Sequence, residues 1–180
     1  MTAQYTRTAI TLHWAIALMI FTIFPLGLYM HDLPLSPDKL RLYSYHKWLG
    51  VTIFLLAVLR VTWRVRHRAP PLPAAMPGWE KLASHGVHYL LYALIFAVPL
   101  SGWLMSSAKG VQTVWFGVLP LPDLVAKNKE LGDLLQETHS SLNFLMFAAV
   151  LAHAGAALKH HFIDRDDILT RMLPFPGRKP

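Results

Sequence analysis

The residues best suited to chemistry in this sequence are two histidines at the ends of one apolar stretch. His139 and His153 bound the run HSSLNFLMFAAVLAH, which contains few other polar groups. In a helix, fourteen residues at about 100° per residue come to about 40° short of four full turns, so both imidazoles leave the same face. The rise of about 1.5 Å per residue separates them by about 21 Å along the axis. This spacing predicts two sites stacked along one helix rather than one site that uses both histidines.

Histidine is the strong ligand type that this composition leaves for a metal. The sequence has ten histidines and no cysteine. The lack of cysteine excludes thiolate-bound zinc, iron–sulfur clusters, disulfides and covalently attached c-type haem, and it leaves the redox compartment undetermined.

The elements that must position these histidines are apolar helices. Hydrophobic residues make up 54% of the 180 residues and charged residues only 15%, which favours a membrane protein over a soluble one. Four apolar stretches are long enough to cross a bilayer as helices. We expect spans at about residues 8–30, 42–64, 85–107 and 138–161, within a single domain that covers residues 1–180. The predicted fold class is therefore an all-α integral membrane protein, a bundle of four transmembrane helices.

The distribution of basic residues predicts the orientation of this bundle. Four spans bring both termini to one side of the membrane, and eleven of the seventeen lysines and arginines fall on that side. By the positive-inside rule we expect cytoplasmic termini in a bacterial inner membrane. The net charge of +7 could also suggest nucleic acid, but the basic residues lie between apolar runs and form no patch with interleaved aromatics. We therefore expect the lipid bilayer, and no nucleic acid, as a partner.

This topology assigns a depth to each histidine within a span. His13 and His153 each lie about 9 Å from the cytoplasmic edge of their helices, so they are level with each other. His46 and His139 both follow shortly after the outer connections and are level near the outer surface. The connection over residues 108–136 is expected to form a partly structured cap on that surface, because a bare loop of that length is unusual.

Two pairs of imidazoles at two depths suit two b-type haems, because each low-spin iron takes axial nitrogens from opposite sides of its macrocycle. Zinc would need three or four ligands converging on one point, which pairs do not supply. We therefore predict one haem between His13 and His153 and another between His46 and His139. The alternative is that these histidines only form hydrogen bonds with neighbouring helices. Ionisable groups within membranes are usually functional, which favours the haem interpretation.

Five further residues are candidates for a quinone site or for contacts with haem propionates. His160 lies seven residues after His153 on the same face and could supply protons to a quinone; the alternative is a surface histidine. Arg60 and Arg64, one turn apart, could pair with propionates or a quinone carbonyl, or could simply anchor the positive side. His85 and His88 share a face at the start of the third span, where they could bind the same groups or remain at the interface.

Several short motifs together resemble the bacterial cytochrome b561 family. They are RTAITLHW at residues 7–14, HKWLG at 46–50, the arginines 60 and 64, ASHGVHYLLY at 83–92, PLSGW at 99–103, the histidines 139 and 153, and KHHF at 159–162. The similarity covers nearly the whole chain. In this family an acidic residue often follows the histidine that corresponds to His139, whereas Ser140 stands here.

The resemblance implies the same ligand pairs as the depth comparison, with His13 and His153 on one haem and His46 with His139 on the other. It also implies membrane electron transfer that involves a quinone. Members of this family include superoxide oxidase, which passes electrons from superoxide to ubiquinone, and more distant relatives that serve as membrane subunits of hydrogenases and formate dehydrogenases.

Three functions follow as hypotheses. The first is an enzyme, a superoxide:ubiquinone oxidoreductase, in which a small soluble donor reaches the shallow outer haem and electrons move inward. The second is an electron-carrying membrane anchor that binds a hydrogenase or dehydrogenase subunit, for which the segment 108–136 could serve as the docking site. The third is a structural bundle without haem. The outer side carries six basic residues that could attract an anion such as superoxide. They are Lys39, Arg41, Lys47, Lys109, Lys127 and Lys129.

Overall fold

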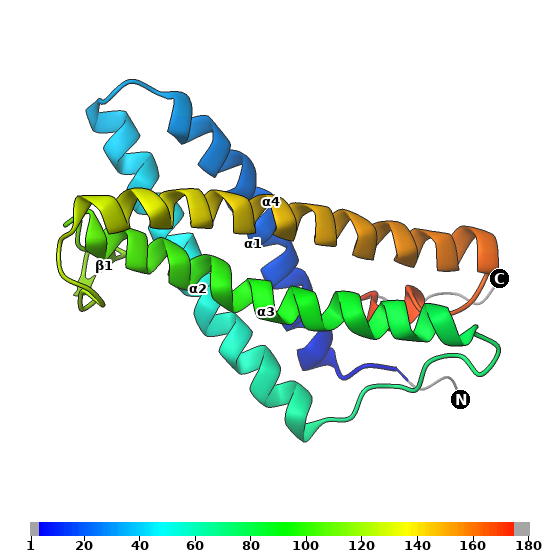
Figure 1. Cartoon of the computed structure of the whole chain (residues 1–180). Coiled ribbons are helices and arrows are strands. Elements are labelled where there is room, and N and C mark those ends of the chain that lie inside the picture. Colours follow the sequence, from blue (N-terminus) through cyan, green and yellow to red (C-terminus); the bar gives the residue numbers. More distant parts are fainter. Residues whose placement is uncertain (1–3, 175–180) are drawn as a thin grey trace.

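The computed structural model describes residues 4–174, which form four long helices (Figure 1). Their bounds are α1 Arg7–Asp32, α2 Pro37–Arg66, α3 Gly78–Ala108 and α4 Lys129–Lys159. Each is long and apolar enough to cross a membrane. The predicted all-α four-helix fold is confirmed.

Side-chain caps set the starts of three helices and make them longer than the apolar spans. Thr6, Ser36 and Asn128 each accept a hydrogen bond from a backbone N–H in the first turn of α1, α2 and α4 respectively. The third cap is the most consequential, because α4 begins at Lys129, nine residues before the span predicted at 138. The polar turns KELGDLLQE therefore belong to the helix rather than to a loop.

The helices form two antiparallel pairs that cross each other (Figure 1). Helices α3 and α4 make the most extensive contact, α1 and α2 form the second pair, and α2 also packs against α3. The start of α1 and the described chain after α4 lie toward the same end of the molecule. We call this the terminal end, and we call the end with the α1–α2 connection and the strands the distal end.

A small hairpin covers the distal end and confirms the expectation of a structured cap. Strand β1 (Val114–Trp115) pairs antiparallel with β2 (Leu119–Pro120). The turn between them places Phe116 and Gly117 at positive φ angles of 50° and 73°. Two indole N–H groups from the helices hold the hairpin region: Trp48 donates to the carbonyl of Val114 at 2.7 Å, and Trp103 donates to that of Pro122 at 3.0 Å.

The chain after α4 folds back across the terminal end. A π-helical turn, η1 (His160–Asp164), continues α4, and a short 3-10 helix, η2 (Thr170–Met172), follows. The indole of Trp14 donates to the carbonyl of Met172 at 2.8 Å, and Arg171 donates to the carbonyl of Pro71 at 2.6 Å. This segment thus joins α1 to the α2–α3 connection. Single π-helical turns often occur at functional sites.

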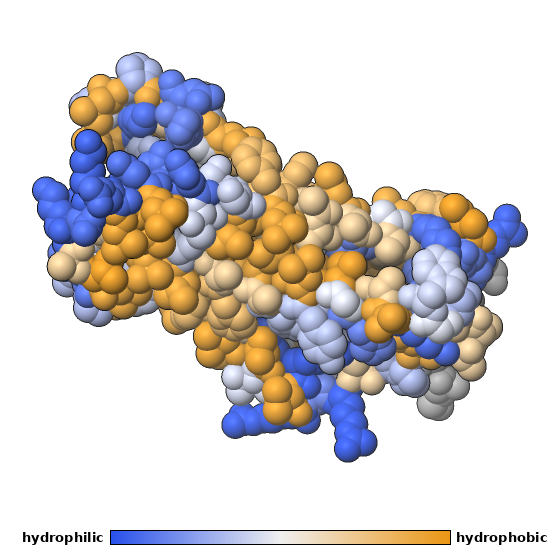
Figure 2. Space-filling model, viewed as in Figure 1, coloured by the Kyte–Doolittle hydropathy of each residue, from blue (hydrophilic) through white to orange (hydrophobic). Residues whose placement is uncertain are grey.

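The hydrophobic core occupies the middle of the bundle. Its buried members come from all four helices: Ile16, Ile53, Ala57, Leu94, Ile95, Met146 and Ala149. In Figure 2 hydrophobic side chains cover the middle of the visible face, and hydrophilic ones gather toward the two ends and at the lower edge. This pattern suits a bundle whose middle faces lipid.

Candidate functional site

Toward the terminal end, α1 and α4 bring two predicted ligands together. The ring centres of His13 and His153 are 6.1 Å apart, with an angle of 72° between the ring planes. A third imidazole approaches from α3, where the ring centre of His88 is 5.0 Å from that of His153. The guanidinium Nη1 of Arg60 on α2 donates to the carbonyl of Ala9 at 3.0 Å, within the turn of α1 that precedes His13. We call this group the terminal-level site.

Toward the distal end, α2 and α4 bring the second pair together. The ring centres of His46 and His139 are 6.3 Å apart, with an interplanar angle of 79°. Both rings line a cavity of about 1150 Å³. This volume lies slightly above the range of about 300–1,000 Å³ that is usual for small-molecule sites. We call this group the distal-level site.

Two helical glycines face the histidines of the distal-level site. A Cβ atom on Gly27 of α1 would lie 3.1 Å from Cε1 of His46, and one on Gly102 of α3 would lie 3.0 Å from Cε1 of His139. Such distances are shorter than the 3.5–4.0 Å at which carbon atoms attract each other best. The rings therefore occupy the space that side chains at these positions would take.

The hydrogen bonding of the two distal rings differs. Nδ1 of His139 lies 3.0 Å from the carbonyl oxygen of Val98 and 2.9 Å from Oγ of Ser101, both on α3. Nδ1 of His46 is buried and faces the backbone of Ile23, but within the described residues it has no well-aligned hydrogen-bond partner. The imidazole of His139 is thus held by contacts of its Nδ1, whereas that of His46 is held mainly by packing.

All four helices repeat the spacing of fourteen residues between the two levels. The pairs, one from each helix, are His13 with Gly27, His46 with Arg60, His88 with Gly102, and His139 with His153. Because fourteen residues nearly complete four turns, each helix presents both of its members on one face. The spacing between His139 and His153 alone does not indicate Gly27, Gly102 or Ser101, which the sequence therefore did not predict as site residues. The same period, applied to the other spans, would have indicated both glycines.

Comparison with known proteins identifies the family to which this chain belongs. The family model described as prokaryotic cytochrome b561 matches residues 4–175. The chain belongs to the prokaryotic cytochrome b561 family.

Three relatives cover nearly the whole length of this family member. It is similar to "Cytochrome b561 homolog 2" of Escherichia coli (strain K12), at 35% identity over 94% of this chain and 91% of the relative. It is also similar to "Cytochrome b561 homolog 1" of the same organism, at 28% identity over 95% and 97%. A third relative is "Probable superoxide oxidase CybB" of Yersinia pestis, at 28% identity over 95% and 96%. Family membership implies membrane electron transfer with b-type haem.

The histidines of this cytochrome fit such a group. Imidazole nitrogens bond to metals at about 2.0–2.1 Å and lie about 1.1 Å from the ring centre, so two opposed ligands place their ring centres about 6.2 Å apart. The observed separations are 6.1 and 6.3 Å. Edge-to-face aromatic pairs can have similar separations. The fit at the distal level therefore depends also on the cavity and on the glycines that make room for the rings.

The remaining predicted residues separate into two groups. Arg60 and His88 belong to the terminal-level site described above. Arg64 is exposed, and its guanidinium carbon lies 5.8 Å from the ring centre of Tyr5. His85 is also exposed, and its Nδ1 lies 2.6 Å from the carbonyl of Lys81 in its own helix. Neither Arg64 nor His85 contributes a ring or a hydrogen bond to the two histidine pairs.

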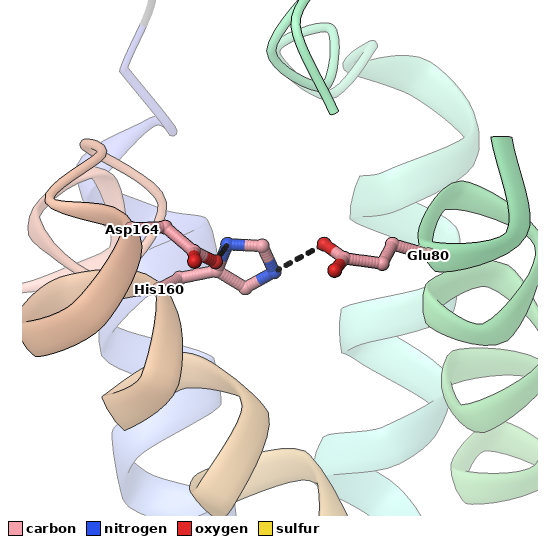
Figure 3. Close-up of side chains that lie close together, drawn as sticks. All are labelled: Glu80, His160 and Asp164. Carbon is pink, nitrogen blue, oxygen red and sulfur yellow. Dashed lines mark ion pairs between the residues drawn. The ribbon is translucent and has the colours of Figure 1, made fainter. Parts of the chain in front are cut away.

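His160, the predicted proton carrier, lies in a cluster of charged groups that follows the terminal-level site along α4. Its side chain is only 12% exposed, and its Nδ1 lies 2.7 Å from Asp166 and 3.0 Å from Asp164. Its Nε2 faces Glu80 of α3 at 3.9 Å (Figure 3). Glu80, His160 and Asp164 are close enough to hold a cation. However, the ammonium of Lys159 already contacts Glu80 at 2.8 Å and Asp164 at 2.9 Å.

Proposed function

We propose that this protein is a di-haem cytochrome of the bacterial inner membrane that acts as a superoxide:ubiquinone oxidoreductase. The observation that carries the proposal is the presence of two facing imidazole pairs at two levels of one bundle. His13 and His153 would hold the haem at the terminal level, and His46 and His139 the haem at the distal level. Bound haem supplies one-electron transfer at each level.

The reaction consumes two superoxide anions, one ubiquinone and two protons, and it yields two molecules of dioxygen and one ubiquinol. Superoxide is oxidised by one electron per molecule, and the quinone receives both electrons. The protein must therefore admit a small anion at one site and deliver two protons at another. The relative named as a superoxide oxidase supports this choice of donor.

The distal cavity is suited to an anionic donor. Lys47 and Lys109 line it together with His46 and His139. Positive groups at the rim of a cavity with low-dielectric walls raise the local concentration of small anions. The sequence alone does not show that Lys47 and Lys109 lie close together, and six acidic residues offset the basic residues of this end.

The terminal end is suited to the quinone. The imidazole of His160 lies between acidic groups of α3 and of the chain after α4, and it can accept a proton from one side and release it at the other. Arg60, fixed beside the terminal-level site, offers a donor to a quinone carbonyl or to a haem propionate. Arg64, His85 and His88 would have secondary roles in the same region.

The excess of basic residues at the terminal end supports a cytoplasmic location for that end. Under this orientation superoxide would arrive from the periplasm, and protons would come from the cytoplasm. The direction of electron flow is then inward, from the distal to the terminal level.

A second candidate function is that of a membrane anchor that relays electrons between a hydrogenase or dehydrogenase subunit and quinone. The hairpin at the distal end favours it, because Phe116 is 57% exposed and Val118 is 83% exposed. A soluble redox partner could dock on this apolar surface.

Two measurements test the proposal. The purified protein should show the reduced α band of b-type haem and contain two haems per chain. A superoxide-generating system should then reduce the haem and, with ubiquinone present, produce ubiquinol at a rate that superoxide dismutase abolishes. Absence of any haem spectrum would refute the haem assignment. Haem that superoxide fails to reduce, together with co-purification of a large redox subunit, would favour the anchor.

A further inference from the structure

Ser101 is a buried hydroxyl that contacts one of the two distal imidazoles. Its residue is 6% exposed on α3, and its Oγ lies 2.9 Å from Nδ1 of His139 and 2.8 Å from the carbonyl oxygen of Val98. Nδ1 of His139 is in turn 3.0 Å from the same carbonyl oxygen. These three polar atoms therefore form a closed triangle in which every side is of hydrogen-bond length.

The triangle determines where the protons lie. The carbonyl of Val98 can only accept, so its contacts with Ser101 and His139 are hydrogen bonds only if both of these neighbours donate to it. If the hydroxyl of Ser101 donated to Nδ1 instead, the lone pairs of Nδ1 and of the carbonyl oxygen would face each other at 3.0 Å. The favourable arrangement has Ser101 O–H donating to Val98 and the Nδ1–H of His139 shared between Val98 and Ser101. Nε2 of His139 is then unprotonated.

The facing imidazole lacks an equivalent arrangement. Nδ1 of His46 is buried without a well-aligned partner among residues 4–174. The ring of His139 also lies against Gly102, where an added Cβ would be 3.3 Å from Nδ1. The distal-level site is thus asymmetric, with one ring fixed in tautomer and orientation and the other less constrained.

We propose that Ser101 is a positioning residue that, with the carbonyl of Val98, leaves Nε2 of His139 free to bind a haem and makes His139 the more strongly donating of the two histidines that would hold the distal haem. The inference rests on the proposed function, in which His139 holds that haem. An imidazole whose N–H donates to two acceptors carries more negative charge at its other nitrogen, which stabilises the oxidised metal. Ser101 therefore lowers the reduction potential of the distal haem and leaves the terminal haem unaffected.

The test is a redox titration of the purified protein, followed by optical spectroscopy, for the wild type and three variants. Ser101→Ala removes one acceptor, and Ser101→Thr retains the hydroxyl. Ser106→Ala is the matched control, because Ser106 is equally buried on α3 but its hydroxyl bonds to the carbonyl of Val111. In Ser101→Ala we expect one of the two midpoint potentials to rise by up to about 59 mV. For one electron this corresponds to a tenfold change in the equilibrium constant for reduction. Ser101→Thr and Ser106→Ala should keep both wild-type values.

Each outcome bears on the proposal. Selective loss of one haem in Ser101→Ala, with retention in Ser101→Thr, also supports it, because removal of a group that orients a ligand lowers metal affinity about 10–100-fold. Unchanged potentials in Ser101→Ala, equal shifts of both haems, or a Thr variant that behaves like the Ala variant would overturn it. If the wild type itself shows no b-type spectrum, the proposed function fails before this inference is reached.

Discussion

Replacing Gly102 with alanine tests the distal-level site most directly. The added methyl group would lie 3.0 Å from Cε1, 3.3 Å from Nδ1 and 3.6 Å from Nε2 of His139. To reach a separation of about 3.5 Å the ring must move by about 0.5 Å. The contacts of Nδ1 with Val98 and Ser101 oppose that movement.

Two opposing effects set the change in stability expected for Gly102→Ala. Alanine in place of glycine stabilises a helix by about 0.5–1 kcal/mol. Displacing the ring weakens two hydrogen bonds that contribute about 0.5–1.5 kcal/mol each. We therefore expect little change in the stability of the helix bundle but a loss of about 10–100-fold in the affinity for the distal haem.

The assay is the haem content per chain, measured from the reduced-minus-oxidised spectrum after purification and dilution. Gly86→Ala is the matched control on α3, because a Cβ at Gly86 meets nothing within 4 Å. We expect Gly102→Ala to retain one haem and Gly86→Ala to retain two. Full haem content and an unchanged spectrum in Gly102→Ala would refute the close contact on which this reasoning depends.

Three further predictions follow from the same geometry. His13→Ala should lower the haem content from two per chain to one, because its partner ring alone cannot ligate iron from both sides. His160→Ala should slow ubiquinone reduction by about 100-fold while leaving haem spectra unchanged, because a positioned proton donor contributes at least that much. Lys47→Glu should slow haem reduction by superoxide by up to about tenfold at low salt, and less at high salt, because it reverses a charge at the cavity.

Each of these predictions has a control or a contradicting result. His31→Ala, an exposed histidine of α1, should keep both haems, and equal haem loss in both variants would contradict the first. His161→Ala, whose ring packs on Phe162, should keep normal quinone turnover. The Lys47→Glu variant is informative only if its haem spectrum is normal, and a rate that is independent of salt would contradict steering.

The sequence predicted the bundle and its four principal histidines because periodicity and depth are properties of single helices. Fourteen residues on one helix fix a face and a distance, so His139 and His153 could be placed before any packing was known. The alternating direction of the four spans was then enough to match the depths of the histidines on different helices. The predicted fold class is confirmed, whereas the ligand assignments remain predictions that the geometry supports.

Features that depend on contacts between helices could not be predicted in this way. The role of Gly102 follows from the ring of His139, which approaches it from another helix. The early start of α4 depends on the cap at Asn128, a signal that the charged residues after it obscured. The surroundings of His160 depend on Glu80, which lies 80 residues earlier in the chain. The roles of Gly102 and Glu80 depend on helix packing, which the hydrophobic pattern alone leaves open, whereas the cap at Asn128 is a local contact.

The core between the two levels leads to a last prediction, concerning charge movement across the membrane. The seven buried members of its hydrophobic cluster provide no side chains that could carry protons between the levels. Under the proposed function we therefore expect protons for the quinone to enter at the terminal end, where His160 lies among acidic groups. If that end is cytoplasmic, electrons move inward while protons are consumed inside, and both movements make the interior negative.

Proteoliposomes with the distal end outward, supplied with superoxide outside and ubiquinone in the bilayer, should therefore develop an inside-negative potential that a voltage-sensitive dye reports. A protonophore should dissipate the dye signal and leave ubiquinol formation intact. Ubiquinol formation without a potential would place proton uptake at the distal end, because inward electrons and inward protons would then cancel. That result would remove His160 from the path and require a proton route from the distal end past the apolar cluster.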